Sequence, residues 1–265
     1  MNAMDAKIAV AQFKPSPFLD KALDNNLLTH LAIMKQAGQC GVTLLVFPEM
    51  SLSGYELERA DTNPLTPSHV AIQTLQQQAE QLNLSIIVGA PWFNPNGKPY
   101  IASLLIRPHL PLLVYCKMHL HAGEEKYVSR GHSYVDFEHH GLHIGMAICA
   151  DTTHSSHPLH YAHLQADVYV ASVLITEQGY AKDSSLLQQY AKEHQLMVMM
   201  ANFCGVSGGW EATGKSCIWA NNGAVLAQAE ATTDMCDDVD FQLLLVEQIQ
   251  GVWQAMSHAG TSINS

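Results

Sequence analysis

Two hydrophobic periodicities alternate along the 265-residue chain. Short apolar runs rich in β-branched residues predict buried strands, and apolar positions three or four residues apart predict amphipathic helices. In the first half, helical spacing covers residues 24–39 and 67–82, and strand-like runs cover 6–12, 42–47, 84–90, 100–107 and 112–117. The last two of these runs are expected to be antiparallel neighbours.

The second half follows a similar outline. Strands are expected at 133–137, 142–149, 167–176, 196–201, 215–219, 224–229 and 239–246, and helices at 158–165 and 180–195. Asn221-Asn222-Gly223 is a strong hairpin signal between two of these strands. This order predicts an α/β fold in which sheet packs on sheet and helices cover the outer faces. No low-complexity linker divides the chain, so one domain spanning 1–265 is expected.

Composition narrows the class of protein. Of all residues, 48% are hydrophobic and 14% are charged, which favours a globular protein with much buried surface. The formal net charge of -11 argues against nucleic acid or an anionic membrane as a main partner. No apolar run reaches the roughly 18 residues of a membrane span. The N-terminus also lacks the pattern of a signal peptide, so we expect a cytoplasmic protein.

The six cysteines show no paired pattern. They lie at 40, 116, 149, 204, 217 and 236, without a CxxC pair and without the spacing of a zinc site. Such scattered cysteines are typical of reduced cytosolic thiols. Most are expected to pack as small hydrophobic side chains, and neither a metal nor a cofactor is expected.

Three predicted strands end on residues that can do chemistry. Glu49 follows the run at 42–47, Lys117 ends the run at 112–117, and Cys149 ends the run at 142–149. Open α/β sheets place their chemistry at the carboxyl ends of strands. Taken singly, each residue has an ordinary explanation: a turn cap, a solvated strand end and a buried thiol.

Together, the three residues form a metal-free set for attack on an amide. A carboxylate can accept the thiol proton as a general base. An ammonium and a backbone N–H can stabilise the negative oxygen of the tetrahedral intermediate, an effect of roughly 10²–10³-fold in rate for one such donor. The sequence therefore favours an amide-cleaving site assembled from distant segments.

Three motifs in this order resemble those of the nitrilase superfamily of carbon–nitrogen hydrolases, in its amidase-like branch. They are LLVFPEMSLSGY around Glu49, YCKMHL around Lys117 and GMAICAD around Cys149. The stretch 124–131 and the late hairpin at 214–227 are similar to the family as well. The likeness covers about residues 5–246 and leaves 247–265 as a C-terminal tail.

The resemblance implies a four-layer αββα sandwich of two mixed β-sheets, assembled as a homodimer or a larger homo-oligomer. It implies that Glu49 is the general base and that Cys149 is the nucleophile that forms a thioester. Lys117 would hold the oxyanion together with the backbone N–H of Ala150. The implied reaction is hydrolysis of a small amide, such as an ω-amide, with water as the second substrate.

Two adjacent acidic residues compete for the role of the family's second glutamate. Glu124 is preferred because of its distance from Gly131, and Glu125 is the alternative. The supporting glutamate would orient Lys117 or the substrate nitrogen.

The loop after Cys149 departs from the family pattern. Many relatives carry an arginine and a Phe-Pro-Glu run there, whereas residues 151–158 of this chain read DTTHSSHP. The departure leaves the acyl group and the preference for amide or nitrile open. It also motivates an alternative, a binding or regulatory member of the same fold with weak catalysis.

The same loop begins a histidine repeat that offers a second alternative, a metal-dependent hydrolase. Successive steps of three residues turn by about 60° around a helix, so we expect a solvated or subunit-facing stripe instead. The histidines are His154, His157, His160 and His163. Trp210 follows Gly208-Gly209 and is expected in the core or at an interface, with a position lining the pocket as the alternative.

Overall fold

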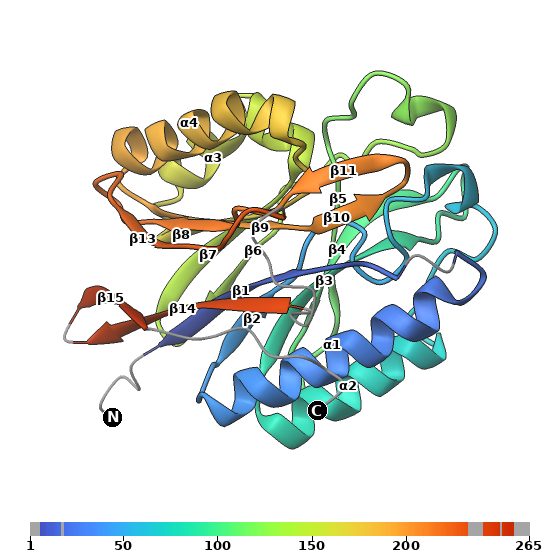
Figure 1. Ribbon diagram of the computed structural model, residues 1–265, viewed down its shortest axis with the longest axis horizontal. Coiled ribbons are helices and arrows are strands. Elements are labelled where there is room, and N and C mark those ends of the chain that lie inside the picture. Colours follow the sequence, from blue (N-terminus) through green and yellow to red (C-terminus); the bar gives the residue numbers. More distant parts are fainter. Residues whose placement is uncertain (1–5, 17–18, 233–240, 250, 257–265) are drawn as a thin grey trace.

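Two β-sheets pack face to face, and helices cover their outer faces (Figure 1). The computed structural model describes residues 6–16, 19–232, 241–249 and 251–256. The layers run helices, sheet, sheet, helices, which confirms the predicted αββα fold class. No helix in these ranges is long and apolar enough to cross a membrane.

The first sheet has seven strands in the order β15-β14-β1-β2-β3-β4-β5. Its centre is parallel from β1 to β3, and the remaining neighbours are antiparallel, including the predicted β4–β5 pair. The strands are β1 (Lys7–Phe13), β2 (Leu44–Val46), β3 (Ser85–Trp92), β4 (Tyr100–Ile106), β5 (Leu113–Cys116), β14 (Phe241–Ile249) and β15 (Val252–Met256). The sequence pattern does not predict β15, which pairs with the end of β14 beyond the limit of 246 expected for the core.

The second sheet has six strands in the order β13-β12-β9-β8-β7-β6, with β7, β8 and β9 parallel. The strands are β6 (Asp136–His139), β7 (Leu142–Ile148), β8 (Val168–Val173), β9 (Met197–Asn202), β12 (Cys217–Trp219) and β13 (Val225–Gln228). The predicted hairpin at Asn221-Asn222-Gly223 joins β12 to β13, and Gly223 has the positive φ of 82° that this turn needs.

A separate two-stranded hairpin, β10 (Cys204–Ser207) and β11 (Trp210–Thr213), lies outside both large sheets. The sequence pattern does not predict it, because glycines interrupt the apolar residues. Both glycines of its turn, Gly208 and Gly209, have positive φ, and a Cβ on Gly208 would lie 2.0 Å from the carbonyl oxygen of Tyr55. The hairpin is therefore fixed against the loop that follows Glu49.

Two helices cover each sheet. Helices α1 (Ala22–Gln39) and α2 (Val70–Leu82) pack on the first sheet, and α3 (Ser156–His163) and α4 (Glu177–His194) pack on the second (Figure 1). Asn83 and Gln195 end α2 and α4 in the left-handed conformation, a common helix stop. Short 3₁₀ turns complete the fold at η1 (Leu19–Lys21), η2 (Leu57–Arg59), η3 (Glu124–Lys126) and η4 (Cys149–Thr153).

Side-chain alternation along β1 explains the layering. Ile8 and Val10 belong to the core between the two sheets, whereas Ala9, Ala11 and Phe13 belong to the core under the helices. Successive strand residues point to opposite faces, so an unbroken apolar run places a strand between two apolar layers. The core between the sheets fixes the strand ends from which the site is built.

Candidate active site

The ammonium group of Lys117 joins two glutamates in the protein interior. Its Nζ lies 2.7 Å from Glu49 Oε1 and 2.7 Å from Glu124 Oε1. Glu49 follows β2, Lys117 follows β5 and Glu124 begins η3, so three separate segments meet at one cation. All three side chains are buried, and buried charges are tolerated only when they are paired in this way.

Burial and charge set the protonation states of this cluster. Burial raises the pKa of Glu49 to about 7, although the nearby Lys117 ammonium opposes the shift. Burial by itself would lower the pKa of Lys117, but the surrounding Glu49, Cys149 and Glu124 raise it overall. Lys117 is therefore a permanent cation, and Glu49 changes its charge near neutral pH.

Cys149 begins the 3₁₀ turn η4 directly after β7. Its φ of 42° is in the left-handed region, which costs of order 1–3 kcal/mol for a residue other than glycine. Its side chain is nearly buried, with Sγ 3.3 Å from His121 Nε2 and 3.7 Å from the carbonyl oxygen of Leu174. Burial and the nearby Glu49 raise the pKa of this thiol, so a base has to remove its proton before it can attack.

The carboxylate of Asp151 links the turn after β7 to the segment after β5. Oδ1 accepts hydrogen bonds from the backbone N–H groups of Met118, at 3.2 Å, and His119, at 2.8 Å. Oδ2 accepts from the backbone N–H of Ile148, at 3.0 Å, and from the hydroxyl of Tyr115, at 2.6 Å. A single buried side chain thus fixes the relative position of the two segments that carry the thiol and the ammonium.

Glu124 has further partners that separate it from its neighbour. Tyr55 donates a short hydrogen bond to Glu124 Oε1, and the backbone N–H of His121 donates to Oε2 at 2.8 Å. Glu125 is exposed, and its carboxylate accepts from the backbone N–H of Gly123 at 2.7 Å. The glutamate in contact with Lys117 is therefore Glu124.

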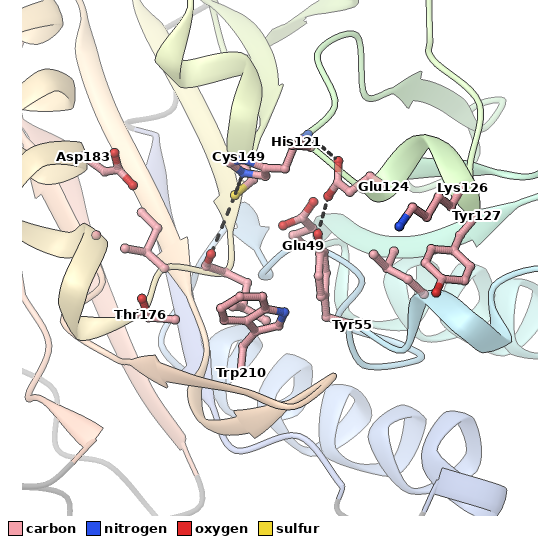
Figure 2. A pocket seen from close by; sticks show the side chains of 16 residues that line it. Glu49, Tyr55, His121, Glu124, Lys126, Tyr127, Cys149, Thr176, Asp183 and Trp210 are labelled. Atoms are coloured by element: carbon pink, nitrogen blue, oxygen red, sulfur yellow. Dashed lines mark hydrogen bonds between the residues drawn. The ribbon is translucent and has the colours of Figure 1, made fainter.

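A cavity of about 560 Å³ opens above these groups. Figure 2 shows Glu49, Cys149 and His121 near its centre, with Asp183 and Lys126 toward opposite sides of the view. Trp210 was expected in the core or at an interface. It is not in the core: it lines the edge of this cavity, the alternative position, with 57% of its surface exposed, since the β10–β11 hairpin carries it there.

Ala150 is the second residue of η4. The first N–H groups of a helical turn have no partner inside that turn, so they are available to a bound group. The carbonyl of Ala150 is engaged, because it accepts hydrogen bonds from Thr153 Oγ1 at 2.8 Å and from His154 Nδ1 at 3.0 Å.

The expected histidine stripe is not one solvated surface. His157, on α3, is buried against two strand residues: its Nε2 lies 2.8 Å from the hydroxyl of Tyr115, and its Nδ1 lies 2.9 Å from that of Tyr169. Burial lowers the pKa of His157 to about 4, so the ring is neutral at pH 7. The prediction of a solvated or subunit-facing stripe is wrong for this residue, because its tyrosine partners come from distant strands.

The other histidines of the repeat point in different directions. His160 stacks on Tyr134 with ring centroids 3.7 Å apart, and His154 stacks on His119 at 3.9 Å. His163 is exposed. In the described ranges, no group of three or more His, Cys, Asp or Glu side chains is arranged to hold a metal ion.

The sequence analysis brings out four of the residues that meet here but misses three others. The four that it brings out line or adjoin the cavity: Glu49, Lys117, Glu124 and Cys149. Tyr55 and His121 enter the site from loops, and Asp151 lies in the 3₁₀ turn η4. The sequence signal for His121 is weak: it lies between Lys117 and Glu124 in a short polar segment. A loop residue of this kind has no periodicity that would single it out.

Comparisons with known proteins identify the family of this chain. The carbon-nitrogen hydrolase family model matches residues 7–250. An (R)-stereoselective amidase from Pseudomonas sp. is 28% identical over 163 residues, which are 61% of this chain and 59% of the relative. The protein N-terminal amidase of Schizosaccharomyces pombe is 34% identical over 161 residues, 55% of this chain and 54% of the relative. The matched segments thus span less than two thirds of either curated relative.

A solved structure extends the comparison to the whole fold. A double mutant of the amidase from Nesterenkonia sp. AN1, in complex with acrylamide, superposes with a TM-score of 0.81 at 21% identity. The superposition covers 93% of this chain and 91% of that one. The likeness establishes a common fold for the two chains.

Proposed function

The chain belongs to the carbon–nitrogen hydrolase family, and on that premise we propose that it hydrolyses the C–N bond of a small non-peptide amide through a Cys149 thioester. One observation carries the proposal. The buried Lys117 cation, held 2.7 Å from the carboxylate oxygens of both Glu49 and Glu124, adjoins the cavity into which Cys149 opens. A base, an oxyanion partner and a nucleophile are thereby available at one place.

Acylation begins with transfer of the thiol proton to Glu49. Glu49 Oε2 is buried and has no hydrogen-bond partner among the described residues, which suits it to accept that proton. The sulfur then attacks the amide carbon, and the carbonyl electron pair moves to oxygen. Two of the three Lys117 protons are used by glutamates, so the third can donate to the oxyanion together with the Ala150 backbone N–H.

Collapse of the tetrahedral intermediate breaks the C–N bond. Glu49 returns its proton to the departing nitrogen, which leaves as ammonia or an amine, and the acyl group stays on the sulfur as a thioester. Glu49 is then ionised again and can take a proton from water, whose oxygen attacks the thioester. Breakdown of the second intermediate releases the acid, and the sulfur regains its proton from Glu49. The glutamate pKa of about 7 suits a group that both accepts and donates protons near neutral pH.

The cavity supports a small amide as substrate. A volume of about 560 Å³ is within the range of small-molecule sites. Its lining is largely apolar beyond the catalytic cluster, with Leu57, Leu174 and Ile175 next to Trp210 and Tyr127. We therefore propose an aliphatic or ω-amide as the substrate, with a small nitrile as the alternative.

The test is ammonia release from a panel of amides by the purified full-length chain. The panel contains acrylamide, butyramide, ω-amides of dicarboxylic acids and amino-acid amides. Wild type and a control variant, Cys217→Ala, are expected to release ammonia from at least one member, and Cys149→Ala is expected to release none. Cys217 is buried in a different part of the second sheet, so it controls for loss of a packed thiol. Equal release by Cys149→Ala and wild type would overturn the mechanism.

We also propose that the chain folds as one domain, and that two copies assemble as a homodimer in the cytoplasm. Leu159 and Leu164, on and just after α3, are exposed apolar residues on an outer helical layer and could pack against a second copy. Light scattering coupled to size-exclusion chromatography tests the assembly. A dimer mass supports the proposal, and a monomer at micromolar concentration contradicts it.

A further inference from the structure

His121 contacts the sulfur of Cys149 from the wall of the cavity. Its Nε2 lies 3.3 Å from Sγ, and its own backbone N–H donates to Glu124 Oε2 at 2.8 Å (Figure 2). The residue lies in the segment between Lys117 and η3, so its position is fixed by the same glutamate that contacts Lys117. The mechanism above gives this side chain no role.

The environment of His121 keeps the imidazole neutral. Burial lowers its pKa, and the Lys117 ammonium lowers it further, against the smaller opposite effects of Glu124, Asp183 and Asp151. A neutral imidazole carries one N–H donor and one acceptor nitrogen. Such a ring can donate a hydrogen bond to a negative atom without changing its own charge.

The sulfur needs a donor when its proton leaves. The carbonyl oxygen of Leu174 is an acceptor and cannot donate to a thiolate, and Glu49 is neutral once it holds the thiol proton. Burial raises the pKa of the thiol, and the Lys117 ammonium lowers it by a smaller amount. Two Lys117 protons are donated to carboxylates, and the third is assigned to the oxyanion in the proposed mechanism. Among the described residues, the side-chain nitrogen in hydrogen-bonding contact with Sγ is His121 Nε2.

We propose that His121 is a further catalytic residue, which donates an Nε2–H hydrogen bond to the Cys149 sulfur as negative charge develops on it. The S–H bond breaks toward Glu49, which takes the proton, and the imidazole keeps its own proton throughout. The same donor stabilises the sulfur when it leaves the tetrahedral intermediate in deacylation. The catalytic consequence rests on the proposed amide hydrolysis, whereas the contact with the thiol can be tested without a substrate.

The test follows alkylation of Cys149 by iodoacetamide between pH 6 and pH 10, quantified by mass spectrometry of the Cys149 peptide. His121→Phe keeps a ring of similar size and removes the donor. His121→Gln places an amide N–H near the position of Nε2 but cannot titrate. His163→Phe, a change at an exposed histidine of α3, is the matched control.

His121→Phe is expected to slow alkylation at neutral pH roughly 10- to 100-fold, the range for a hydrogen bond to a charged group, and to move the pH midpoint upward. His121→Gln and His163→Phe are expected to stay close to wild type. Thermal unfolding midpoints of the variants, together with alkylation in urea, separate a lost donor from a lost fold.

Two outcomes would overturn the proposal. Alkylation of folded His121→Phe with the rate and pH dependence of wild type would show that the ring gives no help to the thiolate. Equal slowing in His121→Gln and His121→Phe would show that the ring acts by titration rather than as a fixed donor. Failure of the wild type to hydrolyse any amide would count against the proposed function alone, because the alkylation result stands without turnover.

Discussion

Lys117 Nζ lies 2.7 Å from Glu49 Oε1, and neither side chain has any surface exposed to solvent. The pair is therefore costly to build and costly to break. Desolvation of two charges takes several kcal/mol per ion, and only close pairing offsets it. The arrangement is explained if the cation is needed where negative charge develops during a reaction.

Replacement of Lys117 by methionine tests this reasoning. The variant keeps the length of the side chain but leaves Glu49 and Glu124 buried without their cation. We expect a loss of about 3–5 kcal/mol in the free energy of unfolding, because an uncompensated buried charge remains. Ammonia release is expected to fall at least about 100-fold, as for removal of an oxyanion donor. Urea unfolding and the amide assay measure the two effects.

Lys215→Met is the matched control for that variant. Lys215 lies 2.8 Å from Glu177 at the surface, where an ion pair contributes about 0–1 kcal/mol. If Lys117→Met were as stable and as active as Lys215→Met, the buried cation would have no function.

The rate of amide hydrolysis is expected to depend on the charge of Glu49. Its pKa is raised to about 7, and only the ionised form can accept the thiol proton. Lowering the pH through 7 protonates the base, so kcat/KM is expected to fall, approaching about tenfold for each pH unit below. Initial rates of ammonia release between pH 5 and pH 9 measure the profile, with circular dichroism to confirm that the fold persists. A rate that is constant from pH 5 to pH 8 would exclude Glu49 as the base.

Asp151→Asn is expected to separate the two segments that Asp151 joins. An asparagine side chain has one acceptor oxygen where the carboxylate has two. The Ile148 backbone N–H and the Tyr115 hydroxyl, which both donate to Oδ2, therefore lose their acceptor in the interior. Each buried unsatisfied group costs about 1–3 kcal/mol. Urea unfolding measures the loss, and iodoacetamide reactivity of Cys149 reports on the turn.

Asp167→Asn provides the comparison for this variant. Asp167 is exposed and accepts one backbone N–H, that of His143, at 2.8 Å. Its replacement is expected to cost less than about 1 kcal/mol. Equal destabilisation by the two changes would mean that Asp151 has no special positioning role.

Gly89 on β3 is expected to tolerate no side chain. A Cβ at this position would lie 2.2 Å from the backbone nitrogen of Met50 and 2.8 Å from the carbonyl carbon of Glu49. Gly89→Ala therefore has to displace the turn that carries the base, and we expect ammonia release to fall even where the protein still folds. Gly97→Ala, whose Cβ would have no neighbour closer than 3.6 Å, is expected to remain active. Full activity of Gly89→Ala would contradict the tight placement of Glu49.

The three strand ends were predictable because apolar runs stop abruptly at Glu49, Lys117 and Cys149. Their meeting point depends on how the sheets pack, since β2 and β5 belong to the first sheet and β7 belongs to the second. The αββα layering follows from the same runs, since strands without a polar face must lie between two apolar layers. The hydrophobic pattern could therefore identify the layering of the fold and the three strand-end residues as candidates for the site.

Loop residues were not predictable in the same way. Tyr55 and His121 lie in loops and Asp151 lies in the 3₁₀ turn η4, so the spacing of apolar residues does not predict where their side chains point. His157 illustrates the converse error, because its three-residue spacing indicated a surface stripe while Tyr115 and Tyr169 enclose it. Strand β15 has mostly exposed or half-buried side chains, so its sequence lacks the apolar alternation of a buried strand.

Cys149 is expected to carry a covalent acyl group during turnover, and rapid quenching can trap it. Wild-type protein is mixed rapidly with an amide that it hydrolyses, quenched with acid within one turnover and digested for mass spectrometry. The covalent mechanism predicts one ammonia released per chain before the acid appears, and an acyl mass on the Cys149 peptide. Release of ammonia and acid together, without any acyl mass on that peptide, would contradict it.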